Sequence, residues 1–193
     1  HPAIAPVMER AAKIAGCSAM SCILAAKLCG EEPKGTVPHA AILMVGDTVK
    51  LAKLYDAQVP AEEPRIVLVD TFKDEAEETM RVAEALGDKL SGIRLDTPGE
   101  RGGVTPDLVR EIRWRLDTAG YNKVQIIATG GLTPERIKVM NEAGADVYGV
   151  GSYITNGAQR DMTMDIKMVN GRPIAKRGRL PGIIPNPKLK RVL

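Results

Sequence analysis

Four charged residues stand close together in the sequence, at the end of one short apolar run. Arg94 and Asp96 lie at the end of the run that begins at Gly92, and Glu100 and Arg101 follow in a glycine-rich loop. Residues two apart in a strand share one face, so Arg94 and Asp96 are predicted to point the same way. An arginine fork binds carboxylate or phosphate groups bidentately, and charges on an inner face need partners or a ligand. A charge-dense loop is often only solvated, but this grouping at a strand end favours a functional role.

Two glycine turns, one helix and one strand apart, predict a phosphate site. The turns are Thr129, Gly130 and Gly131, and Gly149, Val150 and Gly151. Glycine lets backbone N–H groups approach an anion closely, and the helix that follows adds partial positive charge. In (β/α)8 barrels the loops after the last two strands often bind a phosphate in this way. The alternative is two ordinary tight turns of a βα repeat, but their pairing favours the phosphate site.

His39 is one of only two histidines in the chain. It ends the segment Gly35–His39, through which glycine and proline exclude a plain helix. Taken alone, such a histidine is best interpreted as a surface residue or a satisfied core residue. Asp70 closes the apolar run Ile66–Asp70, which is typical of a strand buried on both faces of a parallel sheet.

The hydrophobic pattern predicts alternating strands and helices, and therefore the α/β fold class with a parallel sheet. Strand candidates lie near Ser18, Ile66, Gly92, Val124, Val147 and Thr163. Helices are predicted over Pro2–Ile14, Ile23–Leu28, Asp47–Gln58, Lys73–Leu86, Thr105–Gly120 and Thr133–Gly144, with a hairpin turn at Asn170-Gly171. A closed (β/α)8 barrel takes about 250 residues, so we expect an incomplete barrel-like domain in residues 1–168. Residues 169–193 are predicted to form a basic hairpin and tail.

Composition narrows the class of protein further. The 193 residues are 44% hydrophobic and 26% charged, as is usual for one soluble domain. We expect no membrane association, because there is neither a membrane-spanning run nor a signal-peptide pattern. The three cysteines lack the spacing of a zinc site, which favours free thiols in a reducing cytoplasm. Residues 172–193 hold seven Lys or Arg and no acidic residue, but without interleaved aromatics they do not predict a nucleic-acid partner.

At this point the motifs resemble the nicotinate phosphoribosyltransferase family, especially its shorter archaeal-type branch. The matching pieces are His1-Pro2-Ala3-Ile4, Gly35-Thr36-Val37-Pro38-His39, Leu68-Val69-Asp70-Thr71, Arg94-Leu95-Asp96-Thr97, Thr129-Gly130-Gly131 and Tyr148-Gly149-Val150-Gly151. They cover nearly the whole chain in family order, which makes the resemblance more specific than any single motif. It implies a barrel-like α/β domain of the type II phosphoribosyltransferase kind, joined in the family to an N-terminal α/β sandwich. That first part and the basic residues ahead of His1-Pro2 have no counterpart here, so the chain resembles the later half of such an enzyme.

The resemblance also implies a reaction and its partners. The family joins nicotinate to phosphoribosyl pyrophosphate, giving nicotinate mononucleotide and pyrophosphate in NAD biosynthesis, with ATP and magnesium assisting. The expected polypeptide partners are the enzyme's own N-terminal half, cut or separately encoded, and a second copy in a dimer or higher oligomer.

Residue roles follow from the matched positions. His39 is expected to be phosphorylated by ATP, although Pro38 departs from the family's small residue before the histidine. The two glycine turns would hold the 5-phosphate, and Asp96 would lie near the ribose or its magnesium. Either Arg94 or Arg101 would clamp the nicotinate carboxylate. The expected catalytic residues are His39, Arg94 and Asp96, and the other expected substrate-binding residues are Thr36, Asp70, Glu100 and Arg101.

Three other functions compete with this interpretation. Quinolinate phosphoribosyltransferase shares the fold, but it needs a second cationic clamp and uses no ATP, which the segment Gly35–His39 argues against. Another phosphate-binding barrel, such as an isomerase of amino-acid biosynthesis, explains the glycine turns but not His39. A non-catalytic domain or subunit that only binds a phosphate ligand is the third alternative.

Overall fold

The computed structural model describes residues 1–189, and these divide into two compact units. The first unit is His1–Asn156 and the second begins at Gly157. The units separate at residue 156, whereas the sequence places a domain boundary after residue 168, and that boundary stays a prediction. Residues 190–193, the last of the predicted tail, lie outside the described residues.

The first unit contains a parallel sheet in which the strands follow chain order. Its strands are β1 (Arg65–Leu68), β2 (Leu90–Leu95), β3 (Gln125–Ala128) and β4 (Val147–Tyr148). Leu68 pairs with Arg94 and Arg94 with Ile127, so the carboxyl ends of the strands meet at one edge. The predicted α/β class with a parallel sheet is thus confirmed. Between its first and last strand this sheet does not close in the described part of the chain, as expected for an incomplete barrel.

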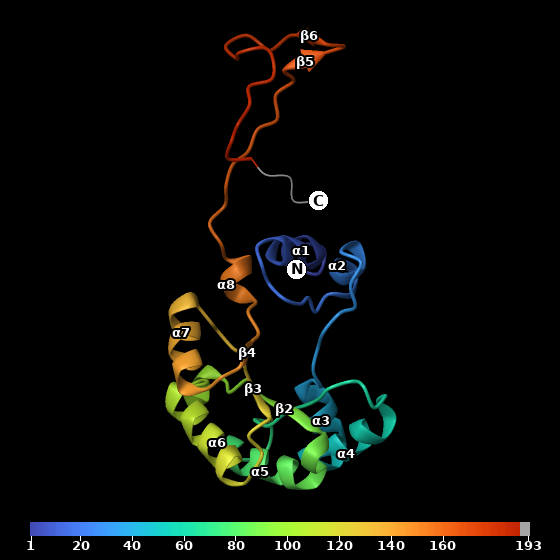
Figure 1. Ribbon diagram of the computed structural model, residues 1–193, viewed down its shortest axis with the longest axis vertical. Helices are drawn as coiled ribbons and strands as arrows, with labels where there is room; N and C mark the ends of the chain where they lie inside the picture. Colours follow the sequence, from blue (N-terminus) through green and yellow to red (C-terminus); the bar gives the residue numbers. More distant parts are fainter. Residues whose placement is uncertain (190–193) are drawn as a thin grey trace. The chain divides into compact units, whose positions relative to one another are not determined.

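Four helices lie along one face of the sheet (Figure 1). They are α4 (Thr48–Gln58), α5 (Glu75–Leu86), α6 (Pro106–Thr118) and α7 (Pro134–Ala143). Asp47, Thr105 and Thr133 begin three of them with side-chain caps onto free backbone N–H groups, as their sequence predicted. The main core lies between these helices and the sheet face that carries Val67, Ile93 and Ile126. The opposite face carries Leu68, Arg94 and Ile127, which leaves its carboxyl end available for polar groups.

The remaining elements are short. They are α1 (Ala5–Ile14), α2 (Ile23–Leu28), α3 (His39–Val45), η1 (Gly87–Lys89), η2 (Gly99–Arg101) and α8 (Ser152–Thr155) in the first unit, and β5 (Met168–Val169) and β6 (Arg172–Pro173) in the second. β5 and β6 pair as the predicted hairpin, and Asp165 joins Lys176 at 3.2 Å and Arg179 at 3.1 Å beside it. Within residues 1–189, no helix is long and apolar enough to cross a membrane.

The structure differs from the sequence prediction at three places. Residues 17–21 form no strand, because no neighbouring strand pairs with them, although Met20 is buried. Only the end of the predicted strand Met162–Val169 is paired. α3 was not predicted, because Gly35 and Pro38 looked like helix breakers.

Arg65 anchors the loop between α4 and β1, at the end of the sheet opposite to the carboxyl edge. Its guanidinium donates to the carbonyl oxygens of Val59 (2.9 Å), Pro60 (2.6 Å) and Glu63 (2.5 Å), and its Nε donates to Asp56 Oδ1 at 3.0 Å. The Arg65 side chain is only 7% exposed, so these carbonyl groups have no easy replacement by water. The loop that leads into β1 is therefore held by one arginine.

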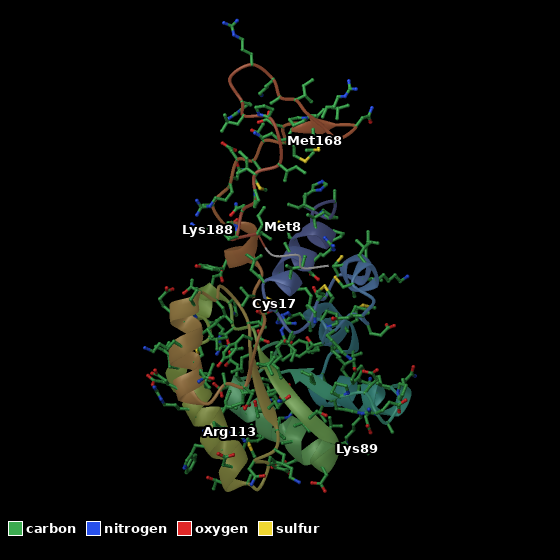
Figure 2. All side chains as sticks on the ribbon, turned by 45° about the horizontal axis from the view of Figure 1, so that its top comes forward. Met8, Cys17, Lys89, Arg113, Met168 and Lys188 are labelled. Atoms are coloured by element: carbon green, nitrogen blue, oxygen red, sulfur yellow. The ribbon has the colours of Figure 1, made fainter. Side chains whose placement is uncertain are left out.

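Replacing Arg65 by Met is expected to lower the free energy of unfolding by on the order of 3 kcal/mol, since buried acceptors lose their donor. Lys89→Met is the matched control. Lys89, labelled in Figure 2 just before β2, binds the other oxygen of Asp56 at 2.7 Å but is 67% exposed. The pKa of Asp56 is lowered, first by the hydrogen bond from Lys89 and then by the one from Arg65. Denaturant unfolding should show a much smaller loss for Lys89→Met. Equal losses in the two variants would contradict the anchoring role of Arg65.

Candidate active site

A closed ring of hydrogen bonds joins β2 and β3 at the carboxyl edge. Arg94 Nη2 donates to Asp96 Oδ2 at 2.6 Å, and Arg94 Nε donates to Thr129 Oγ1 at 3.1 Å. The Thr129 hydroxyl lies 2.7 Å from Asp96 Oδ1 and 2.9 Å from the carbonyl oxygen of Leu95. Arg94 and Asp96 thus share one face, as their spacing predicted, and each side chain is 24% exposed. The ring fixes the Nε and Nη2 edge of the guanidinium.

Arg94 has a third contact, from a distant part of the chain. Its Nη1 donates to Thr36 Oγ1 at 2.9 Å. A guanidinium carries five N–H groups. Its partners in the described residues use three of these, so one N–H group remains on Nη1 and one on Nη2, and these two can donate to a carboxylate.

Thr129 also explains why position 149, at the start of the second glycine turn, is a glycine. A Cβ on Gly149 would lie 2.6 Å from Thr129 Cγ2, closer than side chains tolerate. A Cβ on Gly130 would lie 3.4 Å from Asp96 Oδ1, and Gly130 has a φ of +89° that disfavours other residues. Gly149 is therefore required by packing against Thr129, whereas Gly151 faces open space.

The two glycine turns present unbonded backbone donors. The N–H groups of Thr129 and Gly149 are used, by the carbonyl oxygens of Leu95 and Ala128 respectively. Four further N–H groups find no hydrogen-bond partner within residues 1–189: those of Gly130, Gly131, Val150 and Gly151. Adjacent unbonded amides with glycine flexibility are the donors that an anion needs.

The positive end of α7, which follows the first glycine turn, is already complemented by the side chains of Thr133 and Glu135. Thr133 Oγ1 accepts from the N–H of Arg136 at 3.3 Å and lies 2.8 Å from Glu135 Oε2. The hydrogen bond from the Thr133 hydroxyl holds the pKa of Glu135 below its usual value, so this carboxylate is charged at the helix start. An anion at this edge would therefore be bound chiefly by the turn amides.

His39 and Asp70 form a second polar pair at the same edge. His39 is the first residue of α3, and its Nε2 lies 3.0 Å from Asp70 Oδ2. The Asp70 side chain is 1% exposed, whereas that of His39 is 40% exposed. In the neutral imidazole, a carboxylate beside Nε2 favours the tautomer with the proton on Nε2, and that tautomer has its lone pair on Nδ1. This pair orients the imidazole with a free, nucleophilic nitrogen.

Glu100 and Arg101 stay outside both clusters. Arg101 Nη2 lies 3.6 Å from Glu75 Oε2, and its side chain is 58% exposed. Glu100 is exposed and makes no polar contact with the described residues. Glu75 itself is buried and accepts a hydrogen bond from Thr97 Oγ1 at 2.8 Å. Sequence reasoning missed Glu75, because acidic residues in a first helical turn usually complement the helix dipole at the surface.

Polar side chains and unbonded backbone amides at the carboxyl edge of a parallel sheet are typical of α/β domains that bind their ligands at this edge. Residues 1–165 match the model of a protein family described as "Quinolinate phosphoribosyl transferase, C-terminal domain". The chain therefore belongs to this family.

Several known proteins are similar to the chain. Nicotinate phosphoribosyltransferase pncB1 of Mycobacterium tuberculosis (strain ATCC 25618 / H37Rv) is 32% identical over 92% of this chain and 40% of its own length. Nicotinate phosphoribosyltransferase of Bacillus subtilis (strain 168) is 33% identical over 75% of this chain and 29% of its own. The crystal structure of nicotinate-nucleotide pyrophosphorylase from Pyrococcus furiosus superposes with a TM-score of 0.82 and 48% identity, over 95% of this chain and 47% of the other. The chain spans less than half the length of each of these relatives.

Proposed function

We propose that this chain carries the catalytic edge of a nicotinate phosphoribosyltransferase, which joins nicotinate to phosphoribosyl pyrophosphate in NAD biosynthesis with the assistance of ATP. The observation that carries this proposal is the arrangement of three groups at one edge of the sheet. They are the Arg94–Asp96–Thr129 ring, the unbonded amides of the two glycine turns, and the His39–Asp70 pair. The names of the relatives support the pyridine-nucleotide chemistry.

Arg94 is the better candidate to bind the nicotinate carboxylate. Its guanidinium is held by three partners and keeps two N–H groups for a bidentate contact. Arg101 is more than half exposed and is drawn toward Glu75, so a carboxylate bound there would stay largely hydrated. Because bidentate recognition gains most where the fork is already oriented, the geometry favours Arg94.

In the proposed reaction, the nicotinate ring nitrogen forms a bond to the ribose carbon as the bond from that carbon to pyrophosphate breaks. The electron pair of the broken bond leaves with pyrophosphate. Asp96, held in place by Arg94 at 2.6 Å, stabilises the cationic sugar of the transition state. In residues 1–189, no group of three or more His, Cys, Asp or Glu residues forms a metal cluster. Asp96 is the residue that would hold magnesium, and the bound ion would supply charge neutralisation for the departing pyrophosphate.

The glycine turns are proposed to hold the 5-phosphate, and Gly151 tests this directly. A Cβ at Gly151 meets nothing within 4 Å, so Gly151→Val should fold while occupying the space of the anion. We expect the KM for phosphoribosyl pyrophosphate to rise at least about tenfold, which corresponds to the loss of one or two charge-assisted hydrogen bonds. Gly99→Val, in open space in the loop after β2, is the matched control. An unchanged KM for phosphoribosyl pyrophosphate in Gly151→Val would refute the phosphate site.

Quinolinate transfer is the second candidate, because the matching family model is named for that substrate. Quinolinate has two carboxylates, and each needs a cation. Among the described residues, Arg94 is the one cation in the group formed by Arg94, Asp96, Thr129 and Thr36. Comparing kcat/KM for nicotinate, quinolinate and nicotinamide separates the candidates. Nicotinate should be preferred, and ATP should raise its turnover; a preference for quinolinate would refute the proposal.

The same assay tests whether further polypeptide is needed. Large apolar side chains are exposed in both units, including Val7, Ile23, Met44, Met164 and Ile183. Together with the greater length of the relatives, this supports additional polypeptide and a second copy covering these surfaces. The assay should therefore be run on the chain alone and together with any chain that co-purifies. Full activity of a lone monomer would contradict this part of the proposal.

A further inference from the structure

The segment before His39 is attached to the sheet by a single side chain. Residues Gly35–Val37 have no regular structure, and their backbone makes no hydrogen bond to other backbone groups of residues 1–189. The tie is the Thr36 hydroxyl, which accepts from Arg94 Nη1 at 2.9 Å. Thr36 is one of the expected substrate-binding residues, and in the structure its hydroxyl contacts Arg94, the proposed ligand of the nicotinate carboxylate.

The same short span has a second contact three residues later. His39 Nε2 lies 3.0 Å from Asp70 Oδ2, just beyond β1, whereas Thr36 contacts Arg94 in β2. Leu68 and Arg94 pair across these two strands, so the two contacts stand on neighbouring strands. The span Thr36–His39 therefore bridges the carboxyl ends of β1 and β2.

Pro38 makes this bridge stiff. Its ring restricts φ, which is −81° here with an extended ψ of 156°. A proline also restricts the residue before it, Val37, to extended conformations. Because the two linking residues have little torsional freedom, a displacement of His39 is carried to Thr36 rather than absorbed between them.

We propose that Thr36 is a positioning residue that couples the state of His39 to the orientation of Arg94. This inference rests on the proposed function, in which His39 takes a phosphate from ATP and Arg94 binds the nicotinate carboxylate. Thr36 does not touch the substrate. Its hydroxyl holds the third N–H of Arg94, so a phosphate that displaces the His39 ring also alters the fork presented to nicotinate.

Thr36→Val removes the hydroxyl and keeps the shape of the side chain. In the enzyme as it occurs in the cell, we expect the KM for nicotinate without ATP to rise about tenfold, as for one lost hydrogen bond to a charged group. We also expect the ratio of nicotinate KM values without and with ATP to fall toward one. Thr36→Ser keeps the hydroxyl and should retain the wild-type ratio. Thr118→Val, on the exposed end of α6, should change neither quantity.

Two results would overturn the coupling. One is a wild-type ATP ratio in Thr36→Val. The other is an equal loss in Thr36→Ser, which would assign the effect to packing of the methyl group rather than to the hydroxyl.

A spectroscopic measurement separates this inference from the proposed function. The chain has two histidines, His1 and His39, so the ring nitrogen signals can be followed individually by NMR. Thr36→Val should shift the ring signals of His39 and leave those of His1 unchanged, whatever pyridine the enzyme uses. A wild-type protein that makes no nicotinate mononucleotide would refute the proposed function alone, whereas unchanged His39 signals in Thr36→Val would refute the bridge.

Discussion

Arg94→Gln is expected to abolish the preference for nicotinate over nicotinamide and to lower kcat/KM for nicotinate by on the order of a hundredfold. Two charge-assisted hydrogen bonds to a carboxylate contribute on the order of 3 kcal/mol together, which is roughly that factor. Glutamine also removes the positive charge that Asp96 contacts at 2.6 Å, so the carboxylate loses its orientation as well. Nicotinamide carries no charge, and its kcat/KM should fall much less.

Steady-state kinetics with both pyridines measures this effect. Arg101→Gln is the matched control, since Arg101 is 58% exposed and pairs with Glu75 instead of the ring. Arg94→Lys should be intermediate, because lysine keeps the charge but not the planar fork. If Arg101→Gln erased the preference while Arg94→Gln kept it, the carboxylate site would have to be reassigned to the loop after β2.

His39→Ala is expected to lose all stimulation by ATP while keeping a slow, ATP-independent transfer. In the proposed mechanism the Nδ1 lone pair attacks the terminal phosphate of ATP, and the bond from that phosphate to ADP breaks. The buried Asp70 carboxylate holds the proton on Nε2 and stabilises the positive charge that the ring gains. Alanine removes the nucleophile but leaves the Arg94 ring and the glycine turns in place.

The measurement compares initial rates with and without ATP. His1→Ala is the matched control, because His1 is the other histidine and is exposed. Acid-labile, alkali-stable phosphate should be found on His39 in the wild-type enzyme incubated with ATP. Full ATP stimulation in His39→Ala would make this histidine structural.

The helices were the part of the fold that sequence predicted best, because their signals are local. Asp47, Thr105 and Thr133 each cap a helix through an atom of their own side chain, so neighbouring residues suffice to place the start. The strand expected near Ser18 failed for the opposite reason, since a strand exists only where another strand pairs with it. α3 was missed because Pro38 looked like a break, whereas in the structure it is the residue before the helix.

In the candidate site, too, the local features could be predicted from sequence and the long-range contacts could not. The spacing of Arg94 and Asp96 predicts a shared face, and the chain alone supplies that information. The partners Thr36 and Thr129 lie 58 and 35 residues from Arg94, so no local pattern could reveal that they share its guanidinium. The roles of Gly149 and Gly151 likewise look equal in sequence, but only packing against Thr129 distinguishes them.

Formation of nicotinate mononucleotide tests the central proposal most directly. The purified protein, with any co-purifying chain, is incubated with radiolabelled nicotinate, phosphoribosyl pyrophosphate, magnesium and ATP, and both products are quantified. We predict labelled nicotinate mononucleotide and pyrophosphate in equal amounts, at a rate that ATP increases. Absence of labelled mononucleotide, together with turnover of quinolinate or of no pyridine at all, would contradict the proposal.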